Sequence, residues 1–302
     1  MHCFFTFNLT LIVSSKQMEI DQLQIRRFIM NLLKKIIVLV VLFSLAGVKL
    51  QAANTSNKFG QQNEDGFPTA LELAQPKMLR LSHDVWVGRV GSRLWVHTTT
   101  RRYPDGTIYP ANGMLMETKD ASVLFDTGWT DAQTEVLLLW AERKLRKPVV
   151  KVIVTHAHED RLGGIDELKR KQIPVYSLAL TSEFARAQGV KNAPMPLPGL
   201  EANILRDKWG YDLFFPGAGH SRDNLVVYFR RQHVLFGGCL VKSSSSPSLG
   251  NLDDAVLTDW PNTIAHLKNT YPDAQIVVPG HGTISGDSLA RTLELLRKKS
   301  AG

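Results

Sequence analysis

Four short apolar runs, rich in β-branched residues, end abruptly at a polar side chain. They are residues 122–125 before Asp126, 149–154 before His156, 234–238 before Cys239 and 275–280 before His281. Runs of this length and composition are typical of buried strands. Folds that combine strands and helices hold their functional side chains on loops outside the strand ends. The pattern therefore places each of these groups at the exit of a strand.

Helices are predicted where the apolar period changes to 3.6 residues. The first is predicted to begin at Thr130, whose hydroxyl is expected to form a capping box with Gln133. Further helices are predicted over 165–171, 181–188, 258–269, which has Pro261 in its first turn, and 288–299. The stretch 85–125 is rich in strand formers, and the dipeptide Asn112-Gly113 within it predicts a hairpin turn.

The first fifty residues have the pattern of an export signal. The segment from Met30 has a basic start, an apolar run over 36–45 and a small residue, Ala52, at which cleavage is expected. We therefore expect 1–29 to be an extension upstream of the true start, 30–52 to be a cleaved signal peptide, and 53–302 to be one domain in the periplasm. The apolar run is short for a membrane span, and a retained anchor is the alternative.

The charge of the chain argues against a nucleic-acid partner. The formal net charge is +8. Without residues 1–52, which hold six Lys or Arg and two acidic residues, it falls to about +4. No basic run is interleaved with aromatic residues, so we expect no nucleic-acid binding and no stable membrane association after signal removal.

The exported part of the chain has a single cysteine, because Cys3 lies in the leader and only Cys239 follows it. An unpaired thiol in an oxidising compartment needs shielding, and binding to zinc as a thiolate provides it. A buried apolar cysteine is the alternative interpretation.

Six side chains of the kinds that bind zinc stand in the second half of the chain. They are His156, His158, Asp160, His220, Cys239 and His281. A catalytic zinc ion usually takes three protein ligands and leaves one position for water. Six ligands therefore divide into two open sites with three ligands each.

The motifs around these residues resemble those of the metallo-β-lactamase superfamily. The run His156-Ala-His-Glu-Asp160 is followed by Arg161-Leu-Gly-Gly164, and the motifs 219–224, 237–242, 249–251 and 279–282 recur in order. The resemblance covers residues from about 81 to the C-terminus and is greatest to the first subclass of class B β-lactamases. It implies an α+β fold, a four-layer αββα sandwich with two mixed β-sheets flanked by helices.

The resemblance also divides the ligands between two Zn²⁺ ions. His156, His158 and His220 would hold the first ion, and Asp160, Cys239 and His281 the second. Glyoxalase II and lactonase-type relatives usually have histidine after the aspartate and lack the cysteine, whereas this chain has Arg161 and Cys239. The mono-zinc second subclass has asparagine where this chain has His156.

Further site residues follow from the same resemblance. Lys242 would bind the substrate carboxylate, although a solvated lysine is the alternative. Asn251 would polarise the lactam carbonyl or, alternatively, only form a turn. Trp129 would line the substrate groove or pack in the core. Asp160 and Asn251 are the residues expected to act in catalysis.

Two charged residues next to the ligands, Asp126 and Arg161, are predicted to orient them through hydrogen bonds, with a plain buried ion pair as the alternative. Residues 103–106 would form the tip of a hairpin that covers the substrate. Its flank carries Arg101 and Arg102, more basic than such flaps usually are.

These inferences predict an exported, monomeric enzyme that hydrolyses the amide bond of a small-molecule β-lactam. The nucleophile would be a hydroxide formed at the metals, with no covalent intermediate. The alternatives are a hydrolase of the same fold acting on a thioester, lactone or phosphoester, and a non-catalytic periplasmic zinc-binding protein.

Overall fold

The computed structural model describes residues 76–199 and 203–301, all of which fall in the unit Phe59–Gly302. The expected extension, 1–29, and the expected signal peptide, 30–52, lie outside these residues. Within the described ranges, no helix has both the length and the apolar character that a membrane span needs.

The first sheet has eight strands, which lie side by side in the order of the chain. They are β1 (Met78–Arg80), β2 (Val85–Gly91), β3 (Leu94–Arg102), β4 (Ile108–Glu117), β5 (Ser122–Phe125), β6 (Val149–Ile153), β7 (Val175–Ser177) and β8 (Met195–Pro196). Neighbours are antiparallel from β1 to β5 and parallel from β5 to β8. Because parallel neighbours end at the same edge, the loops after β5 and β6 lie together.

The second sheet has five strands in the order β13-β12-β11-β10-β9. Their bounds are β9 (Ile204–Arg206), β10 (Tyr211–Phe214), β11 (Val226–Phe229), β12 (Val234–Gly238) and β13 (Ile276–Pro279). Only β12 and β13 run parallel, so the carboxyl ends of these two strands also share one edge.

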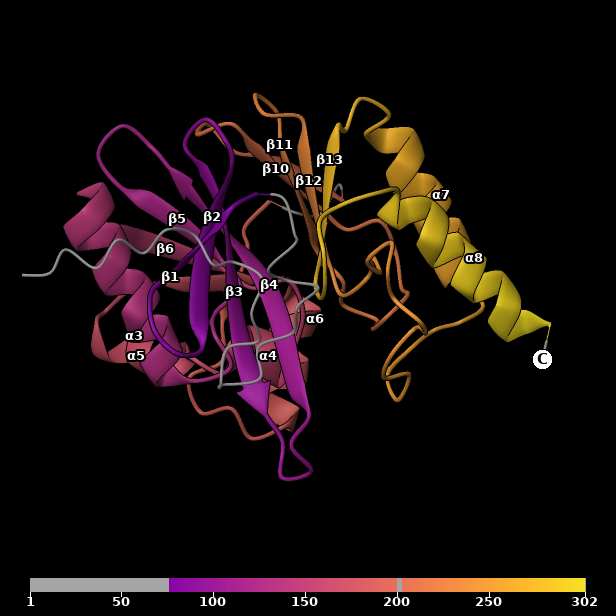
Figure 1. Cartoon of the computed structure of the whole chain (residues 1–302), viewed down its shortest axis with the longest axis horizontal. Helices are drawn as coiled ribbons and strands as arrows, with labels where there is room; N and C mark the ends of the chain where they lie inside the picture. The colour runs from indigo at the N-terminus through magenta and orange to yellow at the C-terminus, as the bar shows by residue number, and fades with distance from the viewer. Residues whose placement is uncertain (1–75, 200–202, 302) are drawn as a thin grey trace, which may run out of the picture. The chain divides into compact units, whose positions relative to one another are not determined.

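Helices cover the outer face of each sheet. They are α3 (Asp131–Trp140) with a π-helical turn η1 (Ala141–Leu145), α4 (Glu159–Leu162), α5 (Ile165–Arg170), α6 (Ala179–Ala187), α7 (Trp260–Thr270) and α8 (Ser288–Ser300). Residues of α3, α5 and α6 pack on the first sheet, and those of α7 and α8 pack on the second. Figure 1 shows α7 and α8 side by side next to β12 and β13.

Alternate residues of the central strands enter different apolar layers, as the two-residue period of a strand requires. Val123 of β5 lies between the sheets, whereas Leu124 packs against the helices of the first sheet. In β12, Phe236 lies between the sheets and Leu235 packs with α7 and α8. Full burial of one such side chain contributes about 1.5–3 kcal/mol. Three apolar layers between four layers of structure confirm the predicted αββα sandwich.

The predicted helices are present with small shifts of their ends. Those predicted over 165–171, 258–269 and 288–299 correspond to α5, α7 and α8, while α6 begins at Ala179, two residues before its predicted start. The Thr130 hydroxyl accepts a hydrogen bond from the Gln133 backbone N–H, as predicted. The Gln133 side chain, however, accepts from the backbone N–H of Trp129, one residue before the cap, so only half of the capping box forms.

The prediction of a hairpin turn at Asn112-Gly113 is wrong, because both residues lie within β4. The Asn112 side chain accepts a hydrogen bond from Thr98 Oγ1 at 2.8 Å across the sheet. At Gly113 a β-carbon would lie 2.2 Å from His97 Nε2, so glycine allows the close approach of the buried imidazole. Here the dipeptide serves packing rather than a turn.

The turn between β3 and β4 lies at its predicted tip. The Gly106 N–H donates to the Tyr103 carbonyl at 2.9 Å, and Gly106 has a φ of 86°, in the left-handed region that favours glycine. Residues 103–106 therefore end the hairpin formed by β3 and β4.

Candidate metal centre

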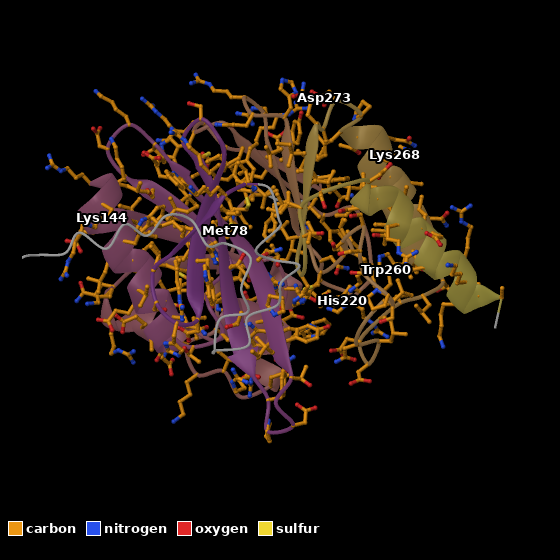
Figure 2. All side chains as sticks on the ribbon, viewed as in Figure 1. Met78, Lys144, His220, Trp260, Lys268 and Asp273 are labelled. Atoms are coloured by element: carbon orange, nitrogen blue, oxygen red, sulfur yellow. The ribbon has the colours of Figure 1, made fainter. Side chains whose placement is uncertain are left out.

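The six candidate ligands come from both sheets. His156 and His158 follow β6, and Asp160 lies in the short helix α4. From the second sheet, Cys239 directly follows β12, and His281 stands two residues after β13. His220 comes from the connection between β10 and β11, and Figure 2 labels it near Trp260 of α7, with 6.0 Å between the ring centroids.

The first donor set consists of His156, His158 and His220, whose ligand atoms lie within 4.8 Å of one another. Nδ1 of His158 is 3.0 Å from Nε2 of His156 and 3.3 Å from Nε2 of His220. Burial, with the neighbouring charges, holds the pKa of His156 and of His220 well below its usual value, so both imidazoles are neutral. Two nitrogens bound tetrahedrally to one zinc ion lie about 3.3 Å apart, so this set fits zinc.

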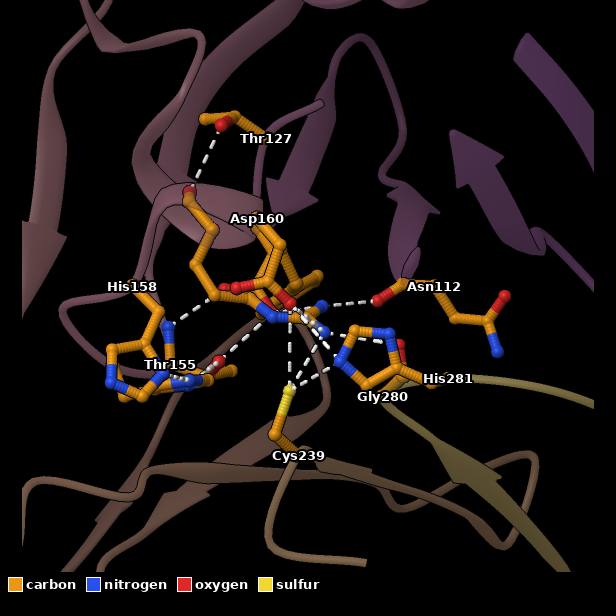
Figure 3. A network of polar contacts seen from close by, with 12 residues as sticks. Asn112, Thr127, Thr155, His158, Asp160, Cys239, Gly280 and His281 are labelled. Atoms are coloured by element: carbon orange, nitrogen blue, oxygen red, sulfur yellow. Dashed lines mark hydrogen bonds and ion pairs between the residues drawn. The ribbon is translucent and has the colours of Figure 1, made fainter. Parts of the chain in front are cut away.

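The second donor set consists of Asp160, Cys239 and His281 (Figure 3). Cys239 Sγ lies 3.1 Å from His281 Nε2 and 3.6 Å from Asp160 Oδ2, and the latter two atoms are 3.2 Å apart. The ligand atoms of His156, Asp160 and Cys239 also lie within 4.8 Å of one another, so the two sets adjoin. One carboxylate, one thiol and one imidazole are donors that zinc accepts.

Arg161 lies fully buried behind the second set. Its Nη2 is 2.8 Å from Asp160 Oδ2 and 3.0 Å from Cys239 Sγ. Burial disfavours the charged guanidinium, but Asp160, Cys239 and Asp126 outweigh it and raise the pKa of Arg161. Burial likewise opposes ionisation of Asp160, but Arg161 and His281 hold its pKa well below its usual value. Asp160 is therefore ionised, and the oxygen that pairs with Arg161, Oδ2, is also the one that faces Cys239 and His281.

Asp126 holds the chain just before the first histidine. Its carboxylate accepts from the Thr155 N–H at 2.7 Å and from the Thr155 hydroxyl at 2.9 Å, and it lies 3.2 Å from Nη1 of Arg161. Burial raises its pKa to about 6, although Arg161 opposes the shift. Asp126 and Arg161 thus form a buried ion pair, as the alternative interpretation predicts. Each also contacts residues of the site, Asp126 at Thr155 and Arg161 at Asp160 and Cys239.

His281 is oriented by residues of β4 that the sequence analysis did not identify. Its Nδ1 lies 2.7 Å from the Pro110 carbonyl, which leaves Nε2 to face Cys239. The Asn112 side chain donates to the carbonyls of Pro279 and Gly282, at 3.0 and 2.9 Å, on either side of this histidine. An Asn inside an apolar strand, where it must satisfy a buried amide, was the signal for this role.

One cavity of about 480 Å³ opens onto both donor sets. Its walls come from the hairpin tip, the strand exits and the loop before α7, and they include Tyr103, Tyr109, Trp129, Glu159, Gln188, Lys242, Gly250, Asn251 and ligands of both sets. The size is that of a small-molecule site.

Lys242 lies in this cavity with only 7% of its surface exposed. Its Nζ is 5.2 Å from the centre of the Trp260 ring and makes no hydrogen bond or ion pair with any residue that the structure describes. Burial lowers its pKa, against the opposing effect of Cys239 and Asp160. A solvated surface lysine is thus the wrong interpretation.

The other predicted contact residues differ in their surroundings. Asn251 is exposed, and its side-chain oxygen accepts from the Asp253 N–H at 2.9 Å, which is the turn of the alternative interpretation. Trp129 is buried in the cavity wall, edge to face with Tyr109 at 6.5 Å between centroids. Arg101 lies over the Trp129 ring and pairs with Glu159, so it belongs to the same wall.

Comparison with known proteins agrees with this geometry. The model of the metallo-β-lactamase superfamily matches residues 106–281, a range that holds all six candidate ligands. A curated relative from Bacillus cereus, named metallo-β-lactamase type 2, is 40% identical over 215 residues, which are 70% of this chain and 82% of the relative.

Solved structures give the same result. A metallo-β-lactamase from Pontibacter korlensis has a TM-score of 0.65 and 39% identity, and the match covers 70% of this chain and 99% of that one. A metallo-β-lactamase from Pseudomonas aeruginosa, solved in its mono-zinc form, has a TM-score of 0.69 and 33% identity over 76% of this chain and 100% of that one. The chain therefore belongs to the metallo-β-lactamase superfamily, as an enzyme similar to the class B metallo-β-lactamases.

Proposed function

We propose that the protein hydrolyses the amide bond of β-lactams with two zinc ions. The observation that carries the proposal is the buried ammonium of Lys242, which has no anionic partner among the described residues and lies in the cavity onto which both donor sets open. A substrate that has a carboxylate near its reacting carbonyl supplies that partner. The names of the relatives support the same substrate class.

The donor sets are suited to different tasks. His156, His158 and His220 would hold one ion through neutral nitrogens, whereas Asp160, Cys239 and His281 would hold the other through donors that include a carboxylate and the thiolate. Bound zinc supplies a Lewis acid and makes a water-derived nucleophile available near neutral pH. Arg161 keeps Asp160 ionised, and Pro110 keeps Nε2 of His281 directed at the second set.

Three residues of the cavity would place the substrate. Lys242 would bind its carboxylate, and Trp129 would contact its apolar face. Asn251 would donate from its side-chain amide nitrogen to the lactam carbonyl, since its oxygen already accepts from Asp253. No residue of this arrangement has to form a covalent bond with the substrate.

Two alternatives remain distinct from this proposal. A hydrolase of thioesters, lactones or phosphoesters is disfavoured by the combination of Cys239 with Lys242, and a non-catalytic periplasmic zinc-binding protein is disfavoured by the open cavity at both donor sets. Assay of the purified, zinc-loaded protein with a chromogenic cephalosporin and a carbapenem separates the three. We expect turnover that chelation abolishes and zinc restores; no turnover of either compound with both ions bound would refute the proposal.

We also propose that the protein is exported and acts in the periplasm as a monomer. Support for export comes from the basic start, apolar run and cleavage residue of 30–52. N-terminal sequencing of the exported protein tests the expected start and cleavage, and a residue from before Met30 in the mature chain would contradict a start at Met30.

Replacing Lys242 by alanine is expected to raise KM for a carboxylated cephalosporin about 10–100-fold and to change kcat less. A hydrogen bond to a charged group contributes about 1.5–3 kcal/mol, and each 1.4 kcal/mol corresponds to a factor of ten. Steady-state kinetics with the carboxylated substrate and with its methyl ester measure the effect. Lys242→Arg, which keeps the charge, should lose less, and an equal loss for acid and ester would show that Lys242 does not bind the carboxylate.

A further inference from the structure

The indole ring of Trp260 lies next to the ammonium group of Lys242. Trp260 is the first residue of α7 and is fully buried. Its ring centre is 5.2 Å from Lys242 Nζ, within the range over which the face of an aromatic ring attracts a cation. Since the ammonium makes no hydrogen bond or ion pair with a described residue, the indole is its direct attractive contact.

The indole is itself held in one orientation. Its Nε1–H donates a hydrogen bond to the Leu240 carbonyl at 2.9 Å. A β-carbon at Gly219 would lie 3.0 Å from Cδ1 of Trp260, so the backbone of this glycine packs closely on the ring. The His220 ring borders the indole as well, with 6.0 Å between the centroids. These contacts fix the position of the indole before any substrate binds.

The backbone that carries Lys242 is fixed by the same part of the molecule. Leu240, which accepts from the indole, stands two residues before Lys242. The Lys242 N–H donates to the Thr292 hydroxyl of α8 at 2.8 Å. A lysine side chain loses much conformational entropy when a ligand immobilises it. An ammonium that already lies against a fixed ring loses less of this entropy when it binds an anion.

An indole is a different partner for this ammonium from a carboxylate. A carboxylate would neutralise Lys242, and the carboxylate of a substrate would have to displace it. The face of an indole ring attracts the cation but has no net charge and no oxygen acceptor. The missing side chain of Gly250, where a β-carbon would lie 3.9 Å from Lys242 Nζ, leaves space beside the ammonium in the cavity. The positive charge is therefore held in place and stays available to an anion.

We propose that Trp260 is a positioning residue for substrate binding. Through the face of its ring it holds the ammonium of Lys242 at the place where a substrate carboxylate binds. Trp260 is not among the residues that line the cavity, so it acts through Lys242. The inference rests on the proposed function in one respect, that Lys242 binds the carboxylate of the substrate.

The kinetic test compares Trp260→Leu with Trp260→Phe in the purified, zinc-loaded protein. Both substitutions remove the hydrogen bond to Leu240, but only phenylalanine keeps an aromatic face near the ammonium. Trp260→Leu is expected to raise KM for a carboxylated cephalosporin about 3–30-fold, and to change kcat and the KM of the methyl ester less. Trp260→Phe should recover a large part of this loss. When Lys242 is already alanine, Trp260→Leu should raise KM no further.

Trp140→Leu is the matched control for the loss of a buried indole. Trp140 packs between the first sheet and its helices and does not line the cavity. Urea unfolding should show that both leucine variants are destabilised. Only Trp260→Leu should change the ratio of the KM values for acid and ester.

A second measurement needs no turnover and separates this inference from the proposed function. In protein with ¹³C-labelled lysine, loss of a signal in Lys242→Arg identifies the ε-methylene of Lys242. We expect this signal upfield of the other lysine signals, because the ring current of Trp260 shields it. The upfield shift should be absent in Trp260→Leu.

Three outcomes would overturn the inference. They are a Lys242 signal without an upfield shift in the unaltered protein, an equal rise of KM for acid and ester in Trp260→Leu, and the same change of the KM ratio in Trp140→Leu. The first can be observed even if the leucine variants do not fold. A shifted signal without β-lactam turnover would reject the proposed function and keep the contact between Trp260 and Lys242.

Discussion

Replacing Cys239 by serine is expected to lower kcat/KM for β-lactams by about 10²–10³-fold, the cost of removing one electrostatic stabiliser from an active site. A serine hydroxyl stays protonated at neutral pH and is a far weaker zinc ligand than a thiolate. Cys239 is almost completely buried, and serine has a similar volume, so the fold should be retained. Metal analysis should find the second ion lost, and steady-state kinetics should show the loss of turnover.

The Cys239→Ser experiment needs a folding control and a matched variant. Urea unfolding of both chelated proteins should give midpoints that differ little compared with the change in turnover. Cys3→Ser removes the only other cysteine, which lies in the predicted leader, and should leave the mature enzyme unchanged. Unaltered turnover of Cys239→Ser would contradict the assigned ligand role.

Replacing Arg161 by methionine is expected to destabilise the metal-free protein by about 3–5 kcal/mol. This is the usual cost of leaving a buried charge without its partner, and both Asp160 and Asp126 would be left. In the zinc-loaded protein the loss should be smaller, because the ion itself neutralises Asp160. Urea unfolding with and without chelator measures both values.

A matched substitution of a surface arginine shows how much of the stability loss comes from unpaired buried charges and how much from removing an arginine side chain as such. Arg101 pairs with Glu159, but the two side chains are 36% and 62% exposed. Such exposed pairs contribute about 0–1 kcal/mol, so Arg101→Met should hardly change stability. A loss for Arg161→Met that is below 1 kcal/mol, or that zinc does not reduce, would contradict the account of its buried charges.

The strand ends could be predicted from sequence because each couples an apolar run to a chemically distinct residue. β5, β6 and β12 match their predicted runs almost to the residue, and Cys239 follows β12 directly. These elements are defined by local signals, namely β-branched composition and an abrupt polar end. The same signals placed three of the six candidate ligands, His156, Cys239 and His281, at the exits of strands.

The dipeptide Asn112-Gly113 predicts a hairpin turn but lies within β4, because the same two residues can serve either a turn or the packing of a strand. Asn-Gly favours a hairpin turn locally, but here the glycine makes room for His97 and the asparagine holds the loop after β13. Both partners are distant in sequence, and Pro279 is 167 residues away. Local propensity cannot report a contact of that range.

Two further contacts of the site, those of Asp254 and Tyr109, could not be predicted from the sequence. Asp254 stands among other polar loop residues, and only the path of the loop brings it to His158. Tyr109 is one aromatic residue of a strand, and its position against His281, 5.1 Å between ring centroids, depends on how the two sheets meet. Side chains of this kind are identified by tertiary geometry rather than by motif.

Each sheet is built from one continuous half of the chain, β1–β8 before residue 200 and β9–β13 after it. Both donor sets nevertheless draw on both halves, because His220, Cys239 and His281 come from the second half and the others from the first. A truncated or partly synthesised chain that ends before β9 thus has two ligands of one set and one of the other, and it can complete neither. Under the proposed function, a chain therefore becomes active only after β13 and His281, near its far end, have been added.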